Sequence, residues 1–421
     1  MVIKAVRGMN DILPDEIIKW QYLEKISRQV FELYGYSEIR TPILEETSLF
    51  IRGIGKTTDI VSKEMYSFSD SKGRKLTLRP EETASVLRAY LEHSLDKKCG
   101  FGKFYYAGPM FRSERPQSGR SRQFYQIGIE AVGSYSPYLD CEVIDILLKV
   151  LAKLKIEGYV LKLNSVGCKK CRPGFKKILK NNLAKDINLL CPDCRRRFNS
   201  NVFRILDCKK SGCKTAVRKA PAILNYLCEE CKTHFGKVKQ GLELLRIAYK
   251  LDAYLVRGLD YYTKTAFEVE HPLLGAQNAI AAGGRYDDLS LELGGTSLGA
   301  CGMSMGMERV LMTLDALGEG LPLAHKARDI YLAIIGKEAF NPGYKILQQL
   351  RNQNLKAEID YQGKSLKAQL RLAGKLNCKY VIILGEDEIK KNIATLKNMT
   401  TGKQSEVEIT EVANEIRRLL D

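Results

Sequence analysis

The chain has 421 residues, of which 45% are hydrophobic, as is ordinary for a globular protein and sufficient for two or three domains with separate cores. It contains no run of 18 apolar residues, and its first residues lack the apolar stretch of a signal peptide. We therefore expect a cytoplasmic protein without a membrane association. The net charge of +18 favours a polyanionic partner.

The first hundred residues predict a helix and then short strands. Apolar residues recur at helical spacing from Trp20 to Tyr34, with Asn10 and Asp11 ahead of them as a cap and Gly35 as a stop. Two extended segments and a second helix are predicted after it, at residues 37–44, 75–80 and 84–95.

Two alternating segments, residues 104–112 and 122–132, flank a polar loop. This pattern predicts a long antiparallel hairpin. Because side chains alternate along a strand, Gln126 and Glu130 share one face of it. Buried carboxylates are rare without a partner, so this face is a candidate site.

The remaining pattern predicts two kinds of sheet. Strands at 253–256, 266–270 and 300–305 and a helix at 307–317 complete an antiparallel sheet with helices over residues 1–320. Residues 318–322 (Gly-Glu-Gly-Leu-Pro) predict a linker. Beyond it strands and helices alternate, which indicates a small α/β domain: strands at 330–335, 357–361 and 380–384, helices at 344–355 and 366–376, two more short strands and a last helix.

Eight of the twelve cysteines lie in four closely spaced pairs. The first two pairs, Cys168/Cys171 and Cys191/Cys194, match the spacing of a four-cysteine zinc site. The last two pairs match it nearly as well; they are Cys208/Cys213 and Cys228/Cys231. Reduced structural cysteines are the alternative, and disulfides are the weaker interpretation in a cytosolic protein.

The same region carries most of the positive charge. Residues 168–240 hold 19 Lys and Arg against 5 Asp and Glu, so 14 of the 18 net charges lie there. Clustered basic charge is typical of nucleic-acid binding, with a solvated basic face as the alternative.

Two arginines, Arg112 and Arg309, each stand at the edge of an apolar, strand-like run. Arginine keeps its proton, and its planar fork of donors fits phosphate oxygens. The pair therefore predicts a triphosphate site built by the fold, although either residue alone is more often a surface salt-bridge residue. No Gly-x-x-x-x-Gly-Lys-Ser/Thr loop is present, which excludes the usual phosphate-binding loop.

Three further segments place polar residues where an apolar pattern would otherwise continue. Residues 79–83 put Glu81 and Thr83 ahead of a helix, where capping by Thr83 is the alternative to a binding role. Residues 255–263 combine an arginine with two tyrosines. Residues 282–287 contain a Gly-Gly pair, which by itself usually indicates an ordinary turn.

Together these segments resemble the histidyl-tRNA synthetases, a family of class II aminoacyl-tRNA synthetases, over essentially the whole chain. Residues 35–50, 104–132 and 299–314 resemble the three class II motifs, and residues 255–262 and 282–286 resemble segments characteristic of the histidine enzymes. The resemblance implies an α+β fold. It comprises an antiparallel-sheet catalytic domain at 1–323 with a cysteine-rich insertion at about 168–236, and an anticodon-binding α/β domain at 328–421.

The resemblance implies ATP-dependent ligation of L-histidine to tRNA(His) through a histidyl-adenylate, with release of AMP and pyrophosphate. ATP would be a substrate with Mg²⁺ on its outer phosphates, and structural Zn²⁺ is a further candidate held by the eight cysteines. In the family, residues matching Arg112 and Arg257 contact the α-phosphate, Arg257 in place of a metal ion used by other class II enzymes. Arg309 would hold the γ-phosphate.

The resemblance also assigns the other contacts. Glu81 and Thr83 would bind the amino group of histidine, and Gln126 would lie by its carboxylate. The imidazole would be read by Glu130 and Tyr262, with Tyr261 nearby. Contacts with tRNA would come from Gln117 and Arg120 at the acceptor end and from the basic insertion on the acceptor stem. A homodimer through residues 35–50 is expected.

The chain departs from the family pattern at Glu82, which replaces a frequent glycine, and at Lys56, which replaces a frequent acidic residue.

Two alternative functions remain. One alternative is a non-charging regulatory paralogue of histidine biosynthesis. Such paralogues usually lack the anticodon-binding domain and the arginine-tyrosine segment. The other is a zinc-dependent nucleic-acid-binding protein on an inactive synthetase scaffold, against which the intact arginines argue.

Overall fold

The computed structural model describes residues 2–98, 100–318 and 328–420. The chain divides into two compact units, residues 1–321 and 322–421, each with its own sheet. Of the predicted linker only Gly318 lies within the described residues, where it ends a helix with a φ of 68°. Residues 319–322 of that linker, and the predicted domain end at 323, lie outside them. In the described part of the chain, no helix is long and apolar enough to cross a membrane.

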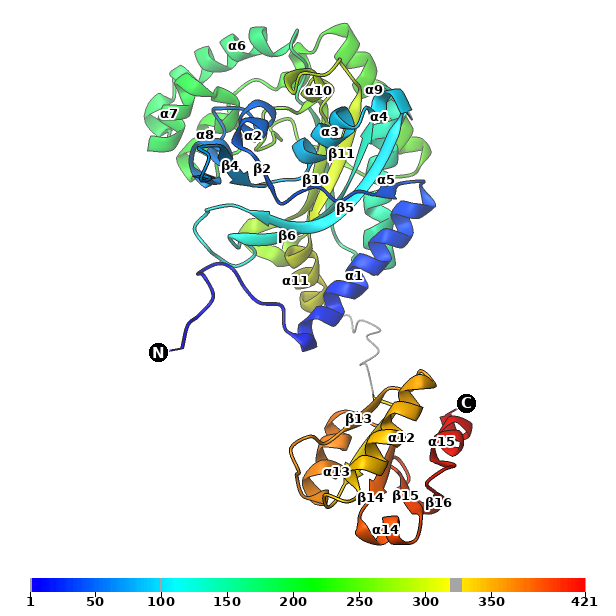
Figure 1. Ribbon diagram of the computed structural model, residues 1–421. Coiled ribbons are helices and arrows are strands. Elements are labelled where there is room, and N and C mark those ends of the chain that lie inside the picture. The colour runs from blue at the N-terminus through cyan, green and yellow to red at the C-terminus, as the bar shows by residue number, and fades with distance from the viewer. Residues whose placement is uncertain (1, 99, 319–327, 421) are drawn as a thin grey trace. The chain divides into compact units, whose positions relative to one another are not determined.

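The first unit is built around an eight-stranded sheet (Figure 1). Its strands lie in the order β1 (Ser37–Glu38), β5 (Gly102–Phe111), β6 (Gln123–Val132), β11 (Ala300–Gly306), β10 (Ala279–Arg285), β9 (Thr263–Glu270), β7 (Val160–Ser165) and β8 (Lys250–Leu251). The central strands pair antiparallel, as predicted, and only the two edge strands pair parallel with their neighbours.

The predicted hairpin is formed by β5 and β6, which pair from Gly102↔Val132 to Phe111↔Gln123. On its other side β6 pairs with β11, so that Glu130 lies opposite Gly302. Side-chain alternation sends Ile127 and Ile129 of β6 into the core and turns Glu130 to the opposite face.

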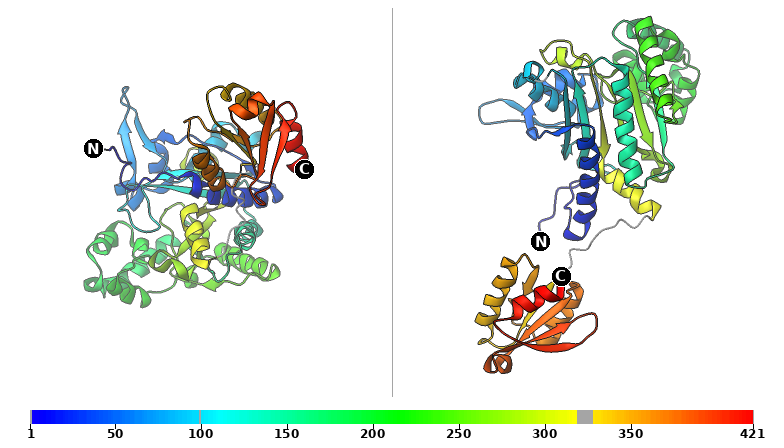
Figure 2. Two further views of the ribbon diagram at one scale, coloured as in Figure 1. Left: turned by 90° about the horizontal axis from the view of Figure 1, so that it is seen from below. Right: turned by 90° about the vertical axis from the view of Figure 1, so that its right-hand side faces the viewer.

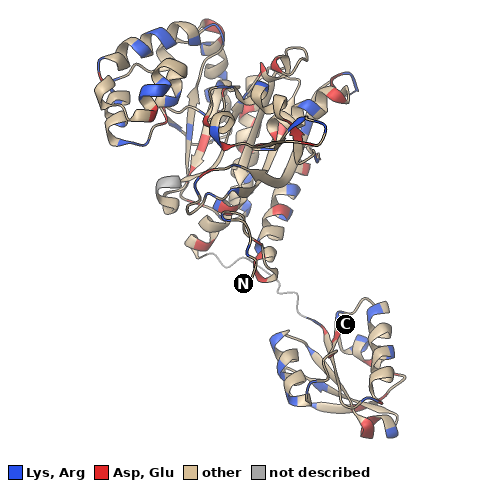
Figure 3. Ribbon diagram, turned by 60° about the vertical axis from the view of Figure 1, so that its left-hand side comes forward, with Lys and Arg blue, Asp and Glu red and all other residues tan. Residues whose placement is uncertain are grey.

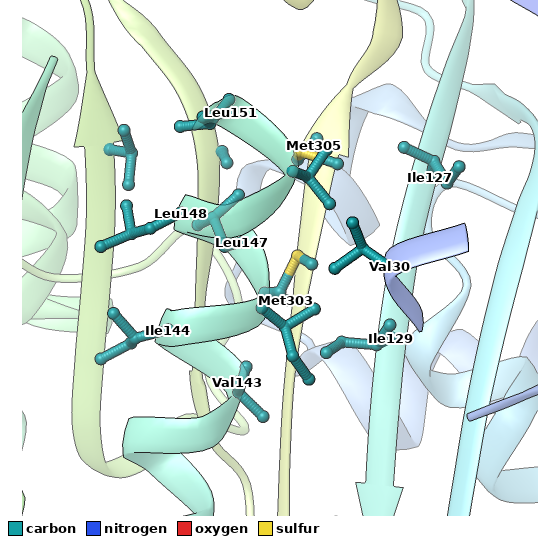
Figure 4. Packing of buried hydrophobic residues seen from close by; sticks show 14 of the residues in the cluster. Val30, Ile127, Ile129, Val143, Ile144, Leu147, Leu148, Leu151, Met303 and Met305 are labelled. Atoms are coloured by element: carbon teal, nitrogen blue, oxygen red, sulfur yellow. The ribbon is translucent and has the colours of Figure 1, made fainter. Parts of the chain in front are cut away.

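Four helices cover the core face of this sheet: α1 (Pro14–Leu33), α5 (Pro137–Lys153), α9 (Glu229–Leu244) and α11 (Met307–Leu317). Figure 4 shows how Val30 of α1 and the leucines of α5 pack against Ile127, Met303 and Met305 of the strands. The predicted cap at Asn10 and Asp11 is wrong. Helix α1 begins at Pro14 without a side-chain cap bond, and proline suits this position because the first N–H of a helix has no intrahelical acceptor.

The opposite face carries a smaller layer. Its sheet has the order β2 (Leu44–Glu46), β4 (Lys75–Leu78), β3 (Tyr66–Ser69). Beside this sheet lie a π-helical turn at Ile60–Glu64 and the helices α2 (Thr47–Ile54), α3 (Thr83–Glu92), α4 (Leu95–Lys98) and α10 (Leu289–Glu292). The helix predicted at 84–95 is thus α3, which packs on the central sheet through Leu87 and Tyr90.

Three segments differ from the prediction. The extended segment predicted at 37–44 is not one strand, because β1 ends at Glu38 and β2, which belongs to another sheet, begins at Leu44. Residues 253–256 are not a strand, because the N–H groups of Tyr254 and Leu255 both bond to Asp252 and close a turn. Conversely, the Gly-Gly pair is not a turn but the middle of β10. A Cβ added to Gly283 would lie 2.3 Å from the carbonyl oxygen of Gly302, so close backbone approach requires glycine there.

The insertion forms a group of helices at one end of the first unit (Figure 1 and Figure 2). It contains α6 (Arg172–Ala184), α7 (Pro192–Ser200), α8 (Ser211–Arg218) and 3-10 turns at Ile187–Leu189, Val202–Ile205 and Ile223–Tyr226. Its own core combines apolar residues such as Phe175 and Ile205 with cysteines. Figure 3 shows lysines and arginines distributed along these helices.

The second unit is the predicted α/β domain. Its sheet has the order β13 (Ala357–Ile359), β12 (Ile330–Ile334), β14 (Tyr380–Leu384), β15 (Ile393–Asn398), β16 (Gln404–Glu408). Helices α12 (Phe340–Asn352) and α15 (Val412–Leu420) share one core cluster, α13 (Leu366–Lys375) contributes to another, and α14 (Glu386–Lys390) packs beside β15.

Candidate active site

A pocket of about 440 Å³ opens on the face of the central sheet that the four helices leave uncovered. It is lined by all but one of the residues predicted for ATP, histidine and the acceptor end: Glu81, Thr83, Arg112, Arg120, Gln126, Glu130, Arg257, Tyr261, Tyr262 and Arg309. These residues are far apart in the chain, and the fold brings them together from the hairpin, the start of α3, the segment before β9 and the start of α11.

Glu130 lies at the floor of the pocket and is only 2% exposed. The Thr83 hydroxyl donates to its Oε1 at 2.7 Å, and the Tyr286 hydroxyl donates to its Oε2. Burial raises the pKa of Glu130 to about 8, so the carboxyl group holds a proton at neutral pH. A Cβ at Gly302 would lie 1.8 Å from Oε2 of Glu130, so this carboxyl can occupy its place only because the opposite residue is glycine.

Glu81 organises the start of α3. Its carboxylate accepts the N–H groups of Thr83 at 2.8 Å and of Ala84 at 3.0 Å, which are amides that a helix terminus leaves without partners. The Thr83 hydroxyl is directed to Glu130 instead, so capping by that hydroxyl is wrong. Burial also raises the pKa of Glu81.

Phenol and amide groups surround these carboxyls. Tyr261 and Tyr262 are buried with ring centroids 4.7 Å apart, and the Tyr261 hydroxyl lies 3.4 Å from Glu81. Burial raises the pKa of Tyr261, which therefore stays a hydrogen-bond donor at physiological pH. The Gln126 amide donates to Ser304 at 3.3 Å.

Each of the three arginines is fixed by oxygen atoms of the protein. Nε of Arg112 donates to the Pro80 carbonyl at 2.9 Å, and its guanidinium lies over the Phe124 ring. Arg309 donates to the carbonyls of Gly119 and Ala279. A guanidinium has five donors, so these bonds leave capacity for an anionic ligand.

Arg257 is held by a carboxylate, with Nη1 2.5 Å from Glu268.

Burial lowers the pKa of Arg309, and the positive charge of Arg120 adds to that effect. This part of the pocket therefore favours a bound anion.

The hairpin loop holds the two residues predicted to meet tRNA. Gln117 and Arg120 exchange backbone hydrogen bonds of 3.1 and 2.9 Å, which close a tight turn at the loop tip. The Arg120 side chain pairs with Glu114 at 2.5 Å and lines the pocket, whereas Gln117 is exposed and is the predicted residue that does not line it.

The cysteines form two groups of four, and in each group the sulfur atoms lie within 4.8 Å of one another. We call them the base cluster (Cys168, Cys171, Cys228 and Cys231) and the rim cluster (Cys191, Cys194, Cys208 and Cys213). The predicted grouping by consecutive pairs is therefore wrong. The first pair meets the last because the chain enters and leaves the insertion at adjacent places, where α6 and α9 begin. All eight are reduced.

Sequence reasoning missed several residues that complete the pocket. Tyr286 belongs to the segment 282–286 that resembles the histidine enzymes, but no role was predicted for it, and it bonds to Glu130. The adjacent Arg285 does not line the pocket and is fully buried between Asp140 and Asp287. Glu268, the partner of Arg257, lies between two apolar residues on a predicted strand. This alternation could have placed its side chain on the pocket face of the sheet. From the insertion, Asp207 and Lys209 reach the pocket without any local signal.

Comparison with known proteins gives a consistent result. The sequence profile of the histidyl-tRNA synthetases matches residues 8–171 and 194–310, and that of the anticodon binding domain matches residues 329–419. A histidine–tRNA ligase of Halothermothrix orenii is 48% identical over 420 residues, and one of Thermodesulfovibrio yellowstonii is 47% identical over 421 residues; each comparison covers all of both chains.

The solved structures agree. The apo histidyl-tRNA synthetase of S. aureus has a TM-score of 0.80 at 34% identity, covering 99% of this chain and all of that one. A Bacillus halodurans protein described as an ATP phosphoribosyltransferase regulatory subunit/histidyl-tRNA synthetase shares the fold, with a TM-score of 0.64 at 19% identity over 91% of this chain and 99% of that one. On the full-length relatives and the profile match, the chain belongs to the histidyl-tRNA synthetase family.

Proposed function

We propose that this protein charges tRNA(His) with L-histidine at the expense of ATP. The observation that carries the proposal is the pocket itself, which brings buried acid and phenol groups together with three arginines on one sheet face, and we assign the former to histidine and the latter to the nucleotide. The full-length relatives named histidine–tRNA ligase support it.

The first step joins histidine to the nucleotide. A carboxylate oxygen of histidine attacks the α-phosphorus of ATP, the bond to the β-phosphate oxygen breaks, and pyrophosphate leaves. The carboxylate is already a nucleophile, so this step needs no general base. It depends on positioning and on neutralising charge at the five-coordinate phosphorus. We assign this charge neutralisation to Arg112 and Arg257, and binding of the γ-phosphate to Arg309.

Histidine is selected at the acid–phenol end. Glu81 and Thr83 bind the amino group, Gln126 lies by the carboxylate, and Tyr262 with Tyr261 closes on the ring. Glu130 shares one proton with the imidazole. A ring without matching nitrogens would leave this buried carboxyl unpaired, which is the costly outcome that discriminates among substrates.

Two kinds of metal ion fit the chain. Mg²⁺ would bind the outer phosphates of ATP and neutralise their charge. Glu114 and Glu268 line the pocket, where they pair with Arg120 and Arg257, and their carboxylates would supply the oxygen ligands that such an ion prefers. Zn²⁺ suits the two thiol clusters, because four thiolates in a compact set favour this ion.

In the second step a hydroxyl of the terminal ribose of tRNA attacks the histidyl carbonyl, and AMP leaves. Gln117 and Arg120 guide the acceptor end, the basic insertion contacts the acceptor stem, and the second unit binds the anticodon. We further assign homodimer formation to residues 35–50, which a measurement of molar mass in solution tests.

The regulatory alternative is less well supported. The Bacillus halodurans protein described as a regulatory subunit/histidyl-tRNA synthetase is 19% identical to this chain, whereas the full-length ligases are 47–48% identical. This chain also retains the segment from Arg257 to Tyr262 and the second unit.

The test is exchange of labelled pyrophosphate into ATP, measured with each of the twenty amino acids and without tRNA. We expect exchange with histidine alone, and charging of tRNA(His) when it is added. Exchange no faster with histidine than without it would reject the enzyme, and exchange without charging would support the regulatory alternative.

A further inference from the structure

The two thiol clusters have the dimensions of tetrahedral metal sites. The Sγ atoms are 3.6 Å apart for Cys168 and Cys171, 3.8 Å for Cys168 and Cys228, and 3.9 Å for Cys191 and Cys208. Four thiolates about 2.3 Å from a zinc ion would be about 3.8 Å from one another. A disulfide would require about 2.05 Å.

Backbone amides also point at these sulfur atoms. The N–H of Cys191 donates to Sγ of Cys213 at 3.2 Å, and the N–H of Cys228 donates to Sγ of Cys171 at 3.1 Å. Such bonds stabilise thiolates and orient them as ligands, in the way that outer hydrogen bonds support metal sites generally.

The base cluster is linked directly to the histidine end of the pocket. Arg172 follows Cys171 in the chain, and its Nη1 donates to the carbonyl oxygen of Tyr262 at 3.1 Å. Its guanidinium also lies over the ring of Phe203 in the insertion core. The position of Tyr262 therefore depends on where the base cluster holds the start of α6.

The rim cluster is linked in the same way to the nucleotide end. Arg204 lies four residues before Cys208, and its Nη1 donates to the carbonyl oxygen of Arg257 at 3.2 Å. Its other nitrogen pairs with Asp59 at 3.4 Å. Asp207 and Lys209, which flank Cys208 on both sides, line the pocket.

We propose that two zinc ions, one in each cluster, hold the active-site segment 257–262 from the insertion side through Arg172 and Arg204. The two arginines are positioning residues, because they donate hydrogen bonds to backbone carbonyls and act on the substrates only through Tyr262 and Arg257. The insertion is then part of the adenylation site as well as a surface for tRNA. This inference rests on the proposed function for its kinetic part, but not for its metal content.

Metal analysis of the full-length protein tests the ions and their pairing. We expect two zinc ions per chain. The double variant Cys168→Ser/Cys228→Ser removes two ligands of the base cluster and loses one ion, whereas Cys168→Ser/Cys191→Ser takes one ligand from each cluster and loses both. If consecutive cysteine pairs shared a site, the first variant would instead lose both ions and the second variant only one. Absence of zinc from protein purified without chelators overturns the proposal.

Because cysteine variants can unfold, the positioning role is tested with arginine variants that leave every ligand in place. Because Arg257 acts in the transition state, Arg204→Ala should lower the exchange rate per active site about tenfold with KM for histidine little changed, whereas Arg172→Ala should raise KM for histidine about tenfold with KM for ATP little changed. Both should retain two zinc ions. Arg204→Lys should recover part of the loss, since lysine can still donate one hydrogen bond.

The exposed Arg218 of the same insertion provides the control, and Arg218→Ala should match the wild type in an exchange assay without tRNA. A merely structural role for Arg172 and Arg204 would lower the fraction of active sites, counted by active-site titration, while leaving the exchange rate per active site and both KM values unchanged. That result overturns the positioning role. Two zinc ions in a protein without exchange activity would instead contradict the proposed function and leave the metal sites standing.

Discussion

The proposed histidine and nucleotide ends of the pocket differ in the type and burial of their side chains. At the proposed histidine end Glu81 and Glu130 are 3% and 2% exposed and are surrounded by hydroxyl and amide donors. At the nucleotide end the arginines are half-buried and are held by carbonyls and by Glu268. A buried acid discriminates among rings, whereas a fixed cation stabilises charge on any phosphate. Selectivity and rate should therefore respond to different substitutions.

Removing a cation at the nucleotide end should have the largest effect. We expect Arg257→Ala to lower kcat for pyrophosphate exchange about 10³-fold, because preorganised charge at the phosphorus is lost in the transition state, with KM for histidine nearly unchanged. Steady-state exchange kinetics measure it. Arg257→Lys keeps the positive charge but not the planar guanidinium group, so its kcat should lie between those of the wild type and Arg257→Ala. A variant whose main change is a higher KM for histidine would break the proposed division of the pocket.

Removing the acid at the other end should act on selection. Glu130→Ala is expected to lower kcat/KM for histidine about 10²-fold, because an imidazole nitrogen and the hydroxyls of Thr83 and Tyr286 lose their partner. Exchange assayed with all amino acids measures the change. Glu130→Gln keeps the shape and should retain more activity. An unchanged preference for histidine over its competitors would refute the role of Glu130.

A smaller effect should come from Gly302, which lies opposite Glu130 on the neighbouring strand. Gly302→Ala places a methyl group where the Glu130 carboxyl lies, so we expect KM for histidine to rise about tenfold with KM for ATP little changed. Gly236→Ala, whose new methyl would meet no atom within 4 Å, is the matched control and should behave as the wild type. Equal behaviour of both variants would mean that the carboxyl does not occupy this place during binding.

The mildest test uses pH. The complex needs one proton shared by Glu130 and the imidazole. Above the Glu130 pKa of about 8 neither partner carries this proton, and below the free imidazole pKa of about 6.5 both do. We therefore expect kcat/KM for histidine to be highest between these values and to fall on both sides, and Glu130→Gln to remove the alkaline limb. A limb that persists in this variant would belong to another group.

The same pKa shift affects stability, with a definite sign. The native state keeps the Glu130 proton up to about pH 8, whereas an unfolded chain loses it near 4.5. The native state therefore binds more protons between these values, and this contribution to stability is lost as pH rises through the window. Burial also raises the pKa of Glu82 and of Glu308 to about 7, so these carboxyls contribute a loss of the same sign. The loss between pH 5 and pH 8, measured by urea unfolding, should therefore be smaller in Glu130→Gln than in the wild type.

The hairpin strands, whose side chains alternate clearly, could be predicted from sequence, and β10, which is built mainly from small residues, could not. The hairpin of β5 and β6 shows clear alternation, and it placed Gln126 and Glu130 on the correct face. Strand β10 reads Ala-Ile-Ala-Ala-Gly-Gly-Arg, and its glycines are required by neighbouring backbones that local sequence does not reveal. The same holds for Tyr286, whose partner lies two strands away.

The cysteine clusters show the same limit. Spacing within each pair is local and was recognised, whereas the choice of partners depends on α6 and α9 starting side by side after some sixty intervening residues. The family resemblance placed ten of the eleven non-cysteine candidates at one pocket, but it did not indicate Asp207 or Lys209, which the insertion brings to the rim.

A crystal structure with a non-hydrolysable histidyl-adenylate analogue tests the two-ended pocket most directly. We expect an imidazole nitrogen within hydrogen-bonding distance of Glu130 and the phosphate between the guanidinium groups of Arg112 and Arg257. An analogue bound with its imidazole among the arginines, or with its phosphate beyond their reach, would contradict it.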